Sequence, residues 1–141
     1  MANETAETIL KTWMSRVWGQ SDVKAIDELL APSALAYGLG PDPLKGPADW
    51  KKFHAGFTGA FKDIKIRVED QVVSGEKVAA RIEGSCVHRA TGKSVTFAGM
   101  IIARVSGGQI QEGWNTVDFL PMLTTLGAVP EGVLAKALGA N

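Results

Sequence analysis

Residues 94–120 read SVTFAGMIIARVSGGQIQEGWNTVDFL, two extended stretches joined by the turn signal SGGQ. Such a pair predicts a β-hairpin, because glycine supplies the positive backbone angles that tight turns between strands require. The pattern continues upstream, where the turn signals SGEK and ATGK separate two more extended runs. We therefore predict four strands of an antiparallel meander, at about residues 64–73, 78–89, 94–105 and 110–119.

The part of the chain before the meander repeats its apolar positions every three or four residues, which is the period of a helix. One helix is expected over residues 3–18, and Ser21 can cap a second helix that Pro32 closes. A short strand is expected over 34–39. A third helix starts near Pro47 and carries one aromatic face, made of Trp50, Phe53, His54, Phe57 and Phe61.

Helices followed by a long antiparallel sheet predict an α+β fold, in which three N-terminal helices cover one face of the sheet. A strongly curved sheet leaves a concavity beneath such helices. The composition is 45% hydrophobic, with four Trp and five Phe, so the concavity is expected to be an apolar pocket. The length of 141 residues fits one domain, 1–141.

Charge and cysteine content narrow the class of partner. Fifteen basic residues balance fifteen acidic ones, so the positive surface that binds nucleic acid or an anionic membrane is not expected. We expect a cytoplasmic protein, because the acidic N-terminus is unlike a signal peptide and Cys86 is the single cysteine. The expected ligand is an apolar small molecule that bears oxygen.

The expected strands are apolar on both of their faces. In residues 94–105, Val95, Phe97 and Ile101 alternate with the apolar Met100 and Ile102. One face can cover the pocket, but the other then needs a second partner. A homodimer that buries this second face is the simplest prediction.

Asp118 is the first candidate for chemistry. Alternation places Trp114, Thr116 and Asp118 on one face of the last strand and Asn115 on the other. A carboxylate that faces an apolar cavity loses hydration, which raises its pKa and suits it to general acid/base catalysis. The alternative is that Asp118 caps a short helix that begins at Pro121.

His54 is the second candidate, because an imidazole on the aromatic helix face could titrate or bind a substrate oxygen. A satisfied structural histidine is the alternative. Tyr37 could donate a hydrogen bond to a carbonyl group. Arg81 and Glu83 share one face of their strand and either pair at the surface or lie in the cavity.

Several kinds of site are not indicated. The sequence has no His and Cys spacing typical of a metal site and no glycine-rich nucleotide motif. We therefore expect no metal and no cofactor.

Residues 108–120 also carry a resemblance. They fit the pattern G-x-I-x-E-x-W-N-x-x-D-x-L, and stretches including VWGQSDVKAIDELLAPSA and TTLGAVP extend the match over nearly the whole chain. The sequence resembles the SnoaL-like polyketide cyclases, within the superfamily of nuclear transport factor 2-like folds. The resemblance implies a cone-shaped half-barrel with a curved sheet around the pocket.

The resemblance also implies a reaction, the cofactor-independent closure of a ring by intramolecular aldol condensation. Asp118 matches the family's general acid/base, and we place His54 beside it. The predicted substrate-binding residues are Tyr37, Trp13, Phe53, Phe57, Arg81, Met100, Trp114 and Asn115. Two rivals stay open: an epoxide hydrolase or isomerase-like enzyme that would use Arg81 and Glu83, and a non-catalytic binding module, favoured if Asp118 is a helix cap.

Overall fold

The computed structural model describes residues 4–139, so the first residue of the helix predicted at 3–18 lies outside the described part. The predicted α+β class is confirmed. The N-terminal half holds short helices around a first strand, β1 (Leu30–Tyr37), and a two-residue strand, β2 (Leu44–Lys45), that the sequence did not indicate. The helices are α1 (Ile9–Trp13), the π-helix η1 (Met14–Gly19), α2 (Lys24–Leu29) and α3 (Gly46–Ala60).

The first predicted helix is therefore two segments, because the chain widens into a π-helix at Met14. Helix α3 begins where Pro47 suggested. The carboxylate of Asp49, in its first turn, accepts the backbone N–H of Lys45 at 2.9 Å. An acidic side chain here satisfies a donor that the helix leaves free and matches the positive end of the helix dipole.

Four long strands form the meander, with bounds within a few residues of those predicted. They are β3 (Phe61–Ser74), β4 (Lys77–His88), β5 (Ser94–Ser106) and β6 (Gln109–Asp118). The six strands form one unclosed sheet in the order β2-β1-β6-β5-β4-β3. The meander is antiparallel as predicted, and the sheet as a whole is mixed, because β1 pairs with β6 in parallel and brings Tyr37 opposite Trp114.

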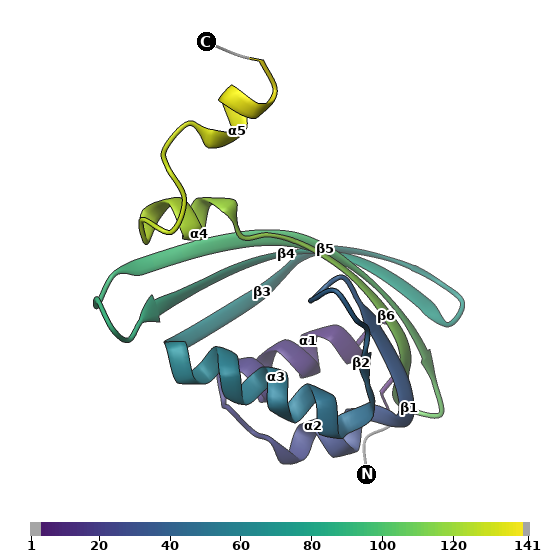
Figure 1. The fold of residues 1–141 in the computed structure, drawn as a ribbon. Coiled ribbons are helices and arrows are strands. Elements are labelled where there is room, and N and C mark those ends of the chain that lie inside the picture. Colours follow the sequence, from purple (N-terminus) through teal and green to yellow (C-terminus); the bar gives the residue numbers. More distant parts are fainter. Residues whose placement is uncertain (1–3, 140–141) are drawn as a thin grey trace.

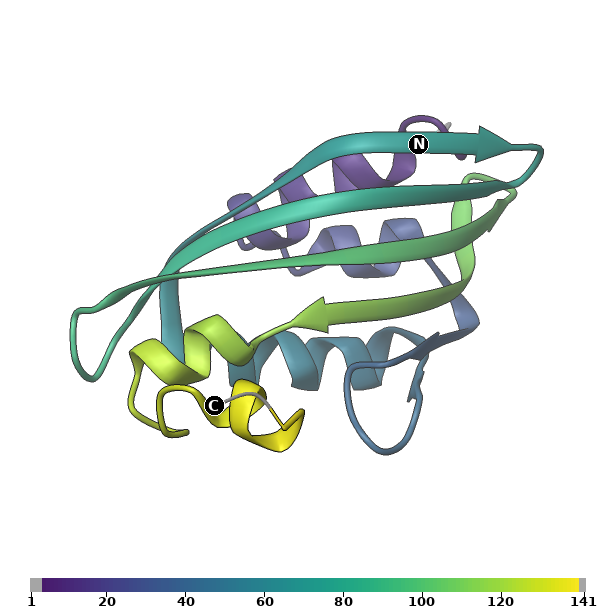
Figure 2. The ribbon, with the colours of Figure 1, turned by 90° about the horizontal axis from the view of Figure 1, so that it is seen from above.

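The sheet bends into an arch, and α1, α2 and α3 lie beneath its concave face (Figure 1). Seen from above, the strands run across these helices as a cover (Figure 2). The most deeply buried side chains are Ile9, Val17, Ile26, Leu29 and Val78, which come from both layers. Burial of one such side chain stabilises the fold by roughly 1.5–3 kcal/mol. The contact between helices and sheet therefore supplies the main hydrophobic stabilisation.

Gly84 of β4 makes room for a ring of the neighbouring strand. It pairs with Phe97 of β5, and a Cβ atom at position 84 would lie 2.3 Å from the Phe97 ring. No side chain larger than hydrogen fits there without moving that ring. Gly84 thus allows Phe97 to lie flat against the concave face of the sheet.

Two short helices, α4 (Leu120–Thr125) and α5 (Val133–Ala137), follow the sheet. Residues 127–139, here called the C-terminal arm, project away from the body (Figure 1). In the arm, Leu134 and Leu138 are 54% and 76% exposed.

No helix within residues 4–139 combines the length and the hydropathy that crossing a membrane requires.

Candidate ligand-binding cavity

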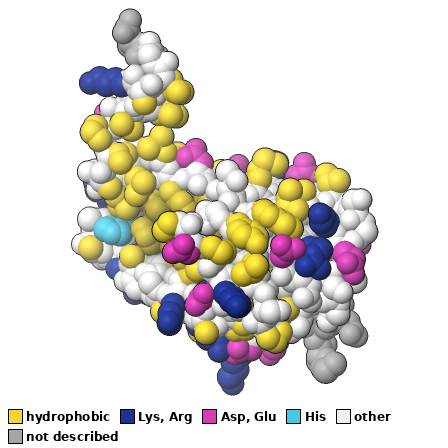
Figure 3. All heavy atoms as spheres, turned by 45° about the vertical axis from the view of Figure 1, so that its right-hand side comes forward, with side chains coloured by type: hydrophobic (Ala, Val, Ile, Leu, Met, Phe, Trp, Pro, Cys, Tyr) yellow, Lys and Arg dark blue, Asp and Glu magenta, His cyan; other side chains and the backbone are white. Residues whose placement is uncertain are grey.

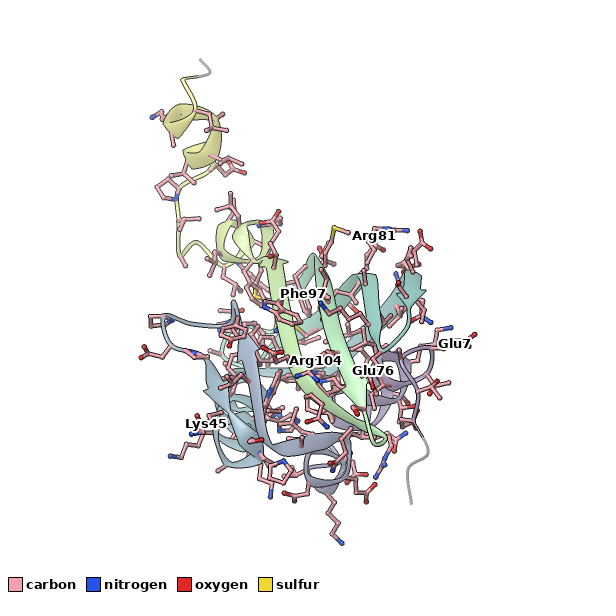
Figure 4. The ribbon with its side chains drawn as sticks, turned by 90° about the vertical axis from the view of Figure 1, so that its right-hand side faces the viewer. Glu7, Lys45, Glu76, Arg81, Phe97 and Arg104 are labelled. Atoms are coloured by element: carbon pink, nitrogen blue, oxygen red, sulfur yellow. The ribbon has the colours of Figure 1, made fainter. Side chains whose placement is uncertain are left out.

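A cavity of about 80 Å³ opens between the helices and the concave face of the sheet. This volume exceeds the ~10–15 Å³ that one water molecule requires, so the space can hold more than a single solvent molecule. Its walls are almost entirely apolar. Phe97, labelled in Figure 4, forms part of the wall that comes from the sheet.

Aromatic rings form the helical wall of the cavity. Trp50, Phe53 and Phe57 follow one another at helical spacing on α3 and face the sheet. The ring of Trp50 meets that of Trp13 edge-to-face with centroids 5.0 Å apart, and the ring of Phe53 at 5.6 Å. Edge-to-face contacts of this kind add stability beyond the buried area. The wall therefore presents a pre-formed aromatic surface.

Alternation along each strand selects the residues of the opposite wall. Inward-facing positions carry aliphatic side chains, among them Ile66, Ile82, Ile101, Ala103 and Val117. On β6 the inward series is Gly113, Asn115, Val117. Asn115 is the one residue among those that line the cavity whose side chain carries an amide, hydroxyl or charged group.

Asp118 lies on the other, convex face of the sheet. Its side chain is exposed, it pairs with Ala98, and its Oδ1 accepts the backbone N–H of Leu120 at 3.1 Å. The side-chain direction that we predicted for Asp118 is wrong. Trp114 and Asp118 do share a face, but that face points away from the cavity. The alternative prediction was that Asp118 caps the following helix. The N-cap residue of α4 is Phe119, and Asp118 lies one residue earlier, where its carboxylate accepts the N–H of the first helical residue, Leu120.

Trp114 and Tyr37 also lie outside the cavity, contrary to the prediction that they line it. Their rings stack on the convex face with centroids 6.2 Å apart and planes 20° apart, as their positions opposite one another in β6 and β1 require. The Lys77 ammonium group lies 5.6 Å from the centroid of Trp114. Both rings are half-buried by this stacking and not by a pocket.

Arg81 and Met100 are likewise on the convex face, with exposed fractions of 52% for the Arg81 side chain and 60% for Met100. Arg81 points outward from the sheet (Figure 4), and its Nη1 lies 3.9 Å from a carboxylate oxygen of Glu83. The hydrolase hypothesis required Arg81 and Glu83 to face inward and hold a water. That arrangement is contradicted, because both side chains occupy outward positions of β4.

His54 is 3% exposed, and it lies behind the aromatic wall instead of lining the cavity. Its Nε2 is 2.9 Å from the Val17 carbonyl oxygen. Because a carbonyl oxygen only accepts hydrogen bonds, Nε2 carries a proton and donates it. The Val17 carbonyl belongs to the π-helix η1. The structure thus agrees with the alternative of a satisfied structural histidine that joins α3 to η1.

Four of the predicted substrate-binding residues lie at the cavity wall: Trp13, Phe53, Phe57 and Asn115. Sequence reasoning missed Trp18, Trp50 and Phe97, which also line it. The signal was available for the two tryptophans, because each shares a helical stripe with a predicted residue. For Phe97 the signal was its place among Val95 and Ile101, the inward series of β5.

Cys86 does not take part in this cavity. Its side chain is 2% exposed, and burial raises the pKa of the thiol to about 11. The thiol is therefore protonated and enclosed near neutral pH.

Comparison with known proteins places this fold in a family. The model of the SnoaL-like polyketide cyclases matches residues 8–126. The chain belongs to the SnoaL-like polyketide cyclase family. No curated protein sequence matches the chain.

Several solved structures share this fold over nearly their whole length. AclR of Streptomyces galilaeus, a suggested hydroxylase, is 25% identical with a TM-score of 0.77, over 90% of this chain and 100% of AclR. IdmH of Streptomyces antibioticus, a suggested polyketide cyclase, is 23% identical with a TM-score of 0.78, over 88% and 99%. TsrD of Streptomyces laurentii is 18% identical with a TM-score of 0.78, over 92% and 99%.

The SnoaL-like match contains every residue that lines the cavity, from Leu10 to Phe119. It ends at residue 126, one residue before the C-terminal arm begins. The cavity is therefore part of the SnoaL-like domain, and the arm lies outside the matched region.

Proposed function

We propose that this SnoaL-like protein binds a flat, largely apolar molecule that carries oxygen, of the polyketide type, in the cavity. One observation carries the proposal: aromatic rings and aliphatic side chains form the walls, and Asn115 supplies the single amide. Ligand pockets with apolar walls and a few placed polar groups bind through shape and area, and use the polar groups for orientation. Such a cavity favours an uncharged ring system over a charged metabolite.

Ring closure of the bound molecule is the second candidate function, and family membership favours it. In that case the rigid wall would hold the flexible substrate in a folded conformation. The entropy cost of bringing the two reacting ends together would then be met on binding, before the reaction step. General acid/base catalysis by Asp118 is not part of this proposal, because that carboxylate lies on the convex face.

Tryptophan emission should report binding, since Trp13, Trp18 and Trp50 line the cavity and Trp114 does not. A flat, oxygenated quencher such as 1,4-naphthoquinone is expected to give saturable quenching below ~1 mM, which corresponds to a binding free energy of about −4 kcal/mol. The Trp114→Phe variant should retain that saturable component, because its remaining tryptophans lie at the wall.

Asp118→Asn is the matched control for this titration. We expect the same dissociation constant as in the wild type, and unchanged turnover once a substrate is found, because the substitution alters only the convex face. Quenching that stays linear up to 1 mM in the wild type would contradict the binding proposal. A loss of turnover in Asp118→Asn with intact folding would restore the acid/base hypothesis.

We also propose that the convex face pairs with a second copy of the chain. Met100 and Ile102 are 60% and 45% exposed there, beside Trp114. Figure 3 shows hydrophobic side chains spread between single charged groups on this side of the body and along the C-terminal arm. Some charges of the sheet form opposite pairs between strands, Arg104 with Glu112 at 3.1 Å and Arg67 with Glu83 at 3.3 Å. Such pairs reduce the like-charge repulsion when the face meets its own copy.

Sedimentation at micromolar concentration should therefore give about twice the chain mass of 15.0 kDa. Met100→Glu, which places a charge in the middle of the proposed contact, should sediment as a monomer. Ala55→Glu is the control, because Ala55 is an exposed position of α3 on the opposite layer. A monomeric wild type would overturn the homodimer.

A further inference from the structure

The orientation of the Asn115 amide is fixed by the neighbouring strand. Its Nδ2 lies 3.0 Å from the backbone carbonyl oxygen of Tyr37, at the end of β1. A carbonyl oxygen only accepts hydrogen bonds, so the atom that faces it must be the amide nitrogen. One N–H and the carbonyl oxygen Oδ1 of Asn115 then remain available.

Neither of these groups has another hydrogen-bond partner among residues 4–139. Among residues 4–139 that are not exposed, Gln71 Oε1 is the one side-chain nitrogen or oxygen that is both enclosed by protein and without a hydrogen-bond partner, so Asn115 Oδ1 is not sealed off. A half-buried amide at the wall of an apolar cavity thus keeps one acceptor and one donor unused. Leaving such groups unpaired when a ligand displaces water costs free energy.

The backbone of Asn115 is held as firmly as its side chain. Gly38, directly after β1, has a φ of +90°, and a Cβ atom at that position would lie 1.8 Å from the Asn115 carbonyl oxygen. The two strands therefore touch through their backbones at this point. Because both contacts restrain Asn115, its free acceptor and donor are pre-organised before any ligand arrives.

We propose that Asn115 selects ligands that carry a hydroxyl or enol group on a flat apolar frame. A hydroxyl can either donate to Oδ1 or accept from the remaining N–H, so it can pair with whichever of the two groups it meets. A ketone or ether can only accept, and a hydrocarbon does neither. This inference rests on the proposed function of the cavity, and it assigns the polar end of the ligand to one residue.

The test compares two probes of matched shape, 2-naphthol and 2-methylnaphthalene, by equilibrium dialysis against the wild type and Asn115→Leu. The quantity of interest is the ratio of the two dissociation constants. The cost of taking each probe from water cancels when this ratio is compared between proteins. We expect Asn115→Leu to shift the ratio by about 3- to 10-fold against 2-naphthol, the value of one ordinary hydrogen bond.

Thr116→Val is the matched control, because Thr116 is the next residue of β6 and is exposed on the convex face. This substitution replaces a hydroxyl by a methyl group of similar size. It should leave the ratio of the two dissociation constants unchanged. If Asn115 only supported the fold, Asn115→Leu would weaken both probes alike, and an unchanged ratio would overturn the inference. If neither probe bound the wild type, the proposed function itself would be contradicted.

A second measurement needs no variant. The side-chain amide signals of Asn115 in a ¹⁵N-correlated NMR spectrum should move when 2-naphthol is added, and move much less with 2-methylnaphthalene. Equal movement with both probes, or none with 2-naphthol at saturation, would overturn the role of Asn115 while leaving the cavity's binding function intact.

Discussion

Gly38→Ala is expected to lower the free energy of unfolding by about 3 kcal/mol or more. Two costs add. A residue other than glycine in the left-handed region costs roughly 1–2 kcal/mol. The added Cβ would also lie 1.8 Å from the Asn115 carbonyl oxygen, and this neighbour is backbone, so the strands must separate. Overpacking of this kind typically costs about 1–3 kcal/mol. Urea denaturation monitored by tryptophan emission measures the loss.

Gly75→Ala separates the two costs. Gly75 has a φ of +59°, but a Cβ atom there meets nothing within 4 Å. We expect this variant to lose only the backbone cost, roughly 1–2 kcal/mol. If the two variants were equally stable, the contact between Gly38 and Asn115 would contribute nothing, and the pre-organisation of Asn115 would rest on its side-chain hydrogen bond to Tyr37 alone.

Trp50→Ala is expected to have a large effect on both stability and ligand affinity. Trp50 is 7% exposed, and its ring meets those of Trp13 and Phe53. Removing a buried tryptophan side chain costs about 3–5 kcal/mol, through lost burial and the cavity left behind. Chemical denaturation gives the stability, and dialysis with 2-methylnaphthalene gives the change in affinity, which is expected to be a loss because one wall is removed.

Trp114→Ala makes the same deletion on the outer face. Trp114 is half-buried against Tyr37, so the loss of stability should be clearly smaller, and the affinity for 2-methylnaphthalene should stay as in the wild type. The variant should instead weaken the homodimer. Trp114→Ala affecting the affinity as strongly as Trp50→Ala would mean that the cavity has been assigned to the wrong face of the sheet.

The strands were predictable because each is a long run bounded by a glycine-containing turn, and such signals are local. The pairing of β1 with β6 was not predictable in this way. Helix α3 and the strands β3, β4 and β5 separate Tyr37 from Trp114 along the chain, although the two residues are opposite one another in the sheet. No local pattern records that contact, so the sequence assigned the first strand no partner in the sheet.

The prediction of the candidate site was wrong at one step, the choice of which face of the last strand lies toward the helices. Alternation correctly separated Trp114 and Asp118 from Asn115, but it does not state which set faces the helices. A large aromatic residue was taken as the inner one. In the structure Tyr37 and Lys77 cover Trp114 on the outside, while the inner set contains Gly113 and Val117.

His54 illustrates a second limit. Its place on the aromatic face of α3 was visible in the sequence, but its partner is a carbonyl group of a π-helix 37 residues earlier. The sequence has no pattern that predicts a π-helix. The π-helix nevertheless determines which backbone carbonyl oxygen is free to accept a hydrogen bond from the imidazole.

The enclosed Cys86 has a practical consequence for labelling. With a thiol pKa of about 11, on the order of one molecule in several thousand carries a thiolate at pH 7.5, and the sulfur is also shielded from solvent. The folded chain should therefore behave toward maleimides as if it contained no cysteine. A single cysteine introduced in the C-terminal arm would accept a fluorophore or spin label at that position alone, with the native residue left in place.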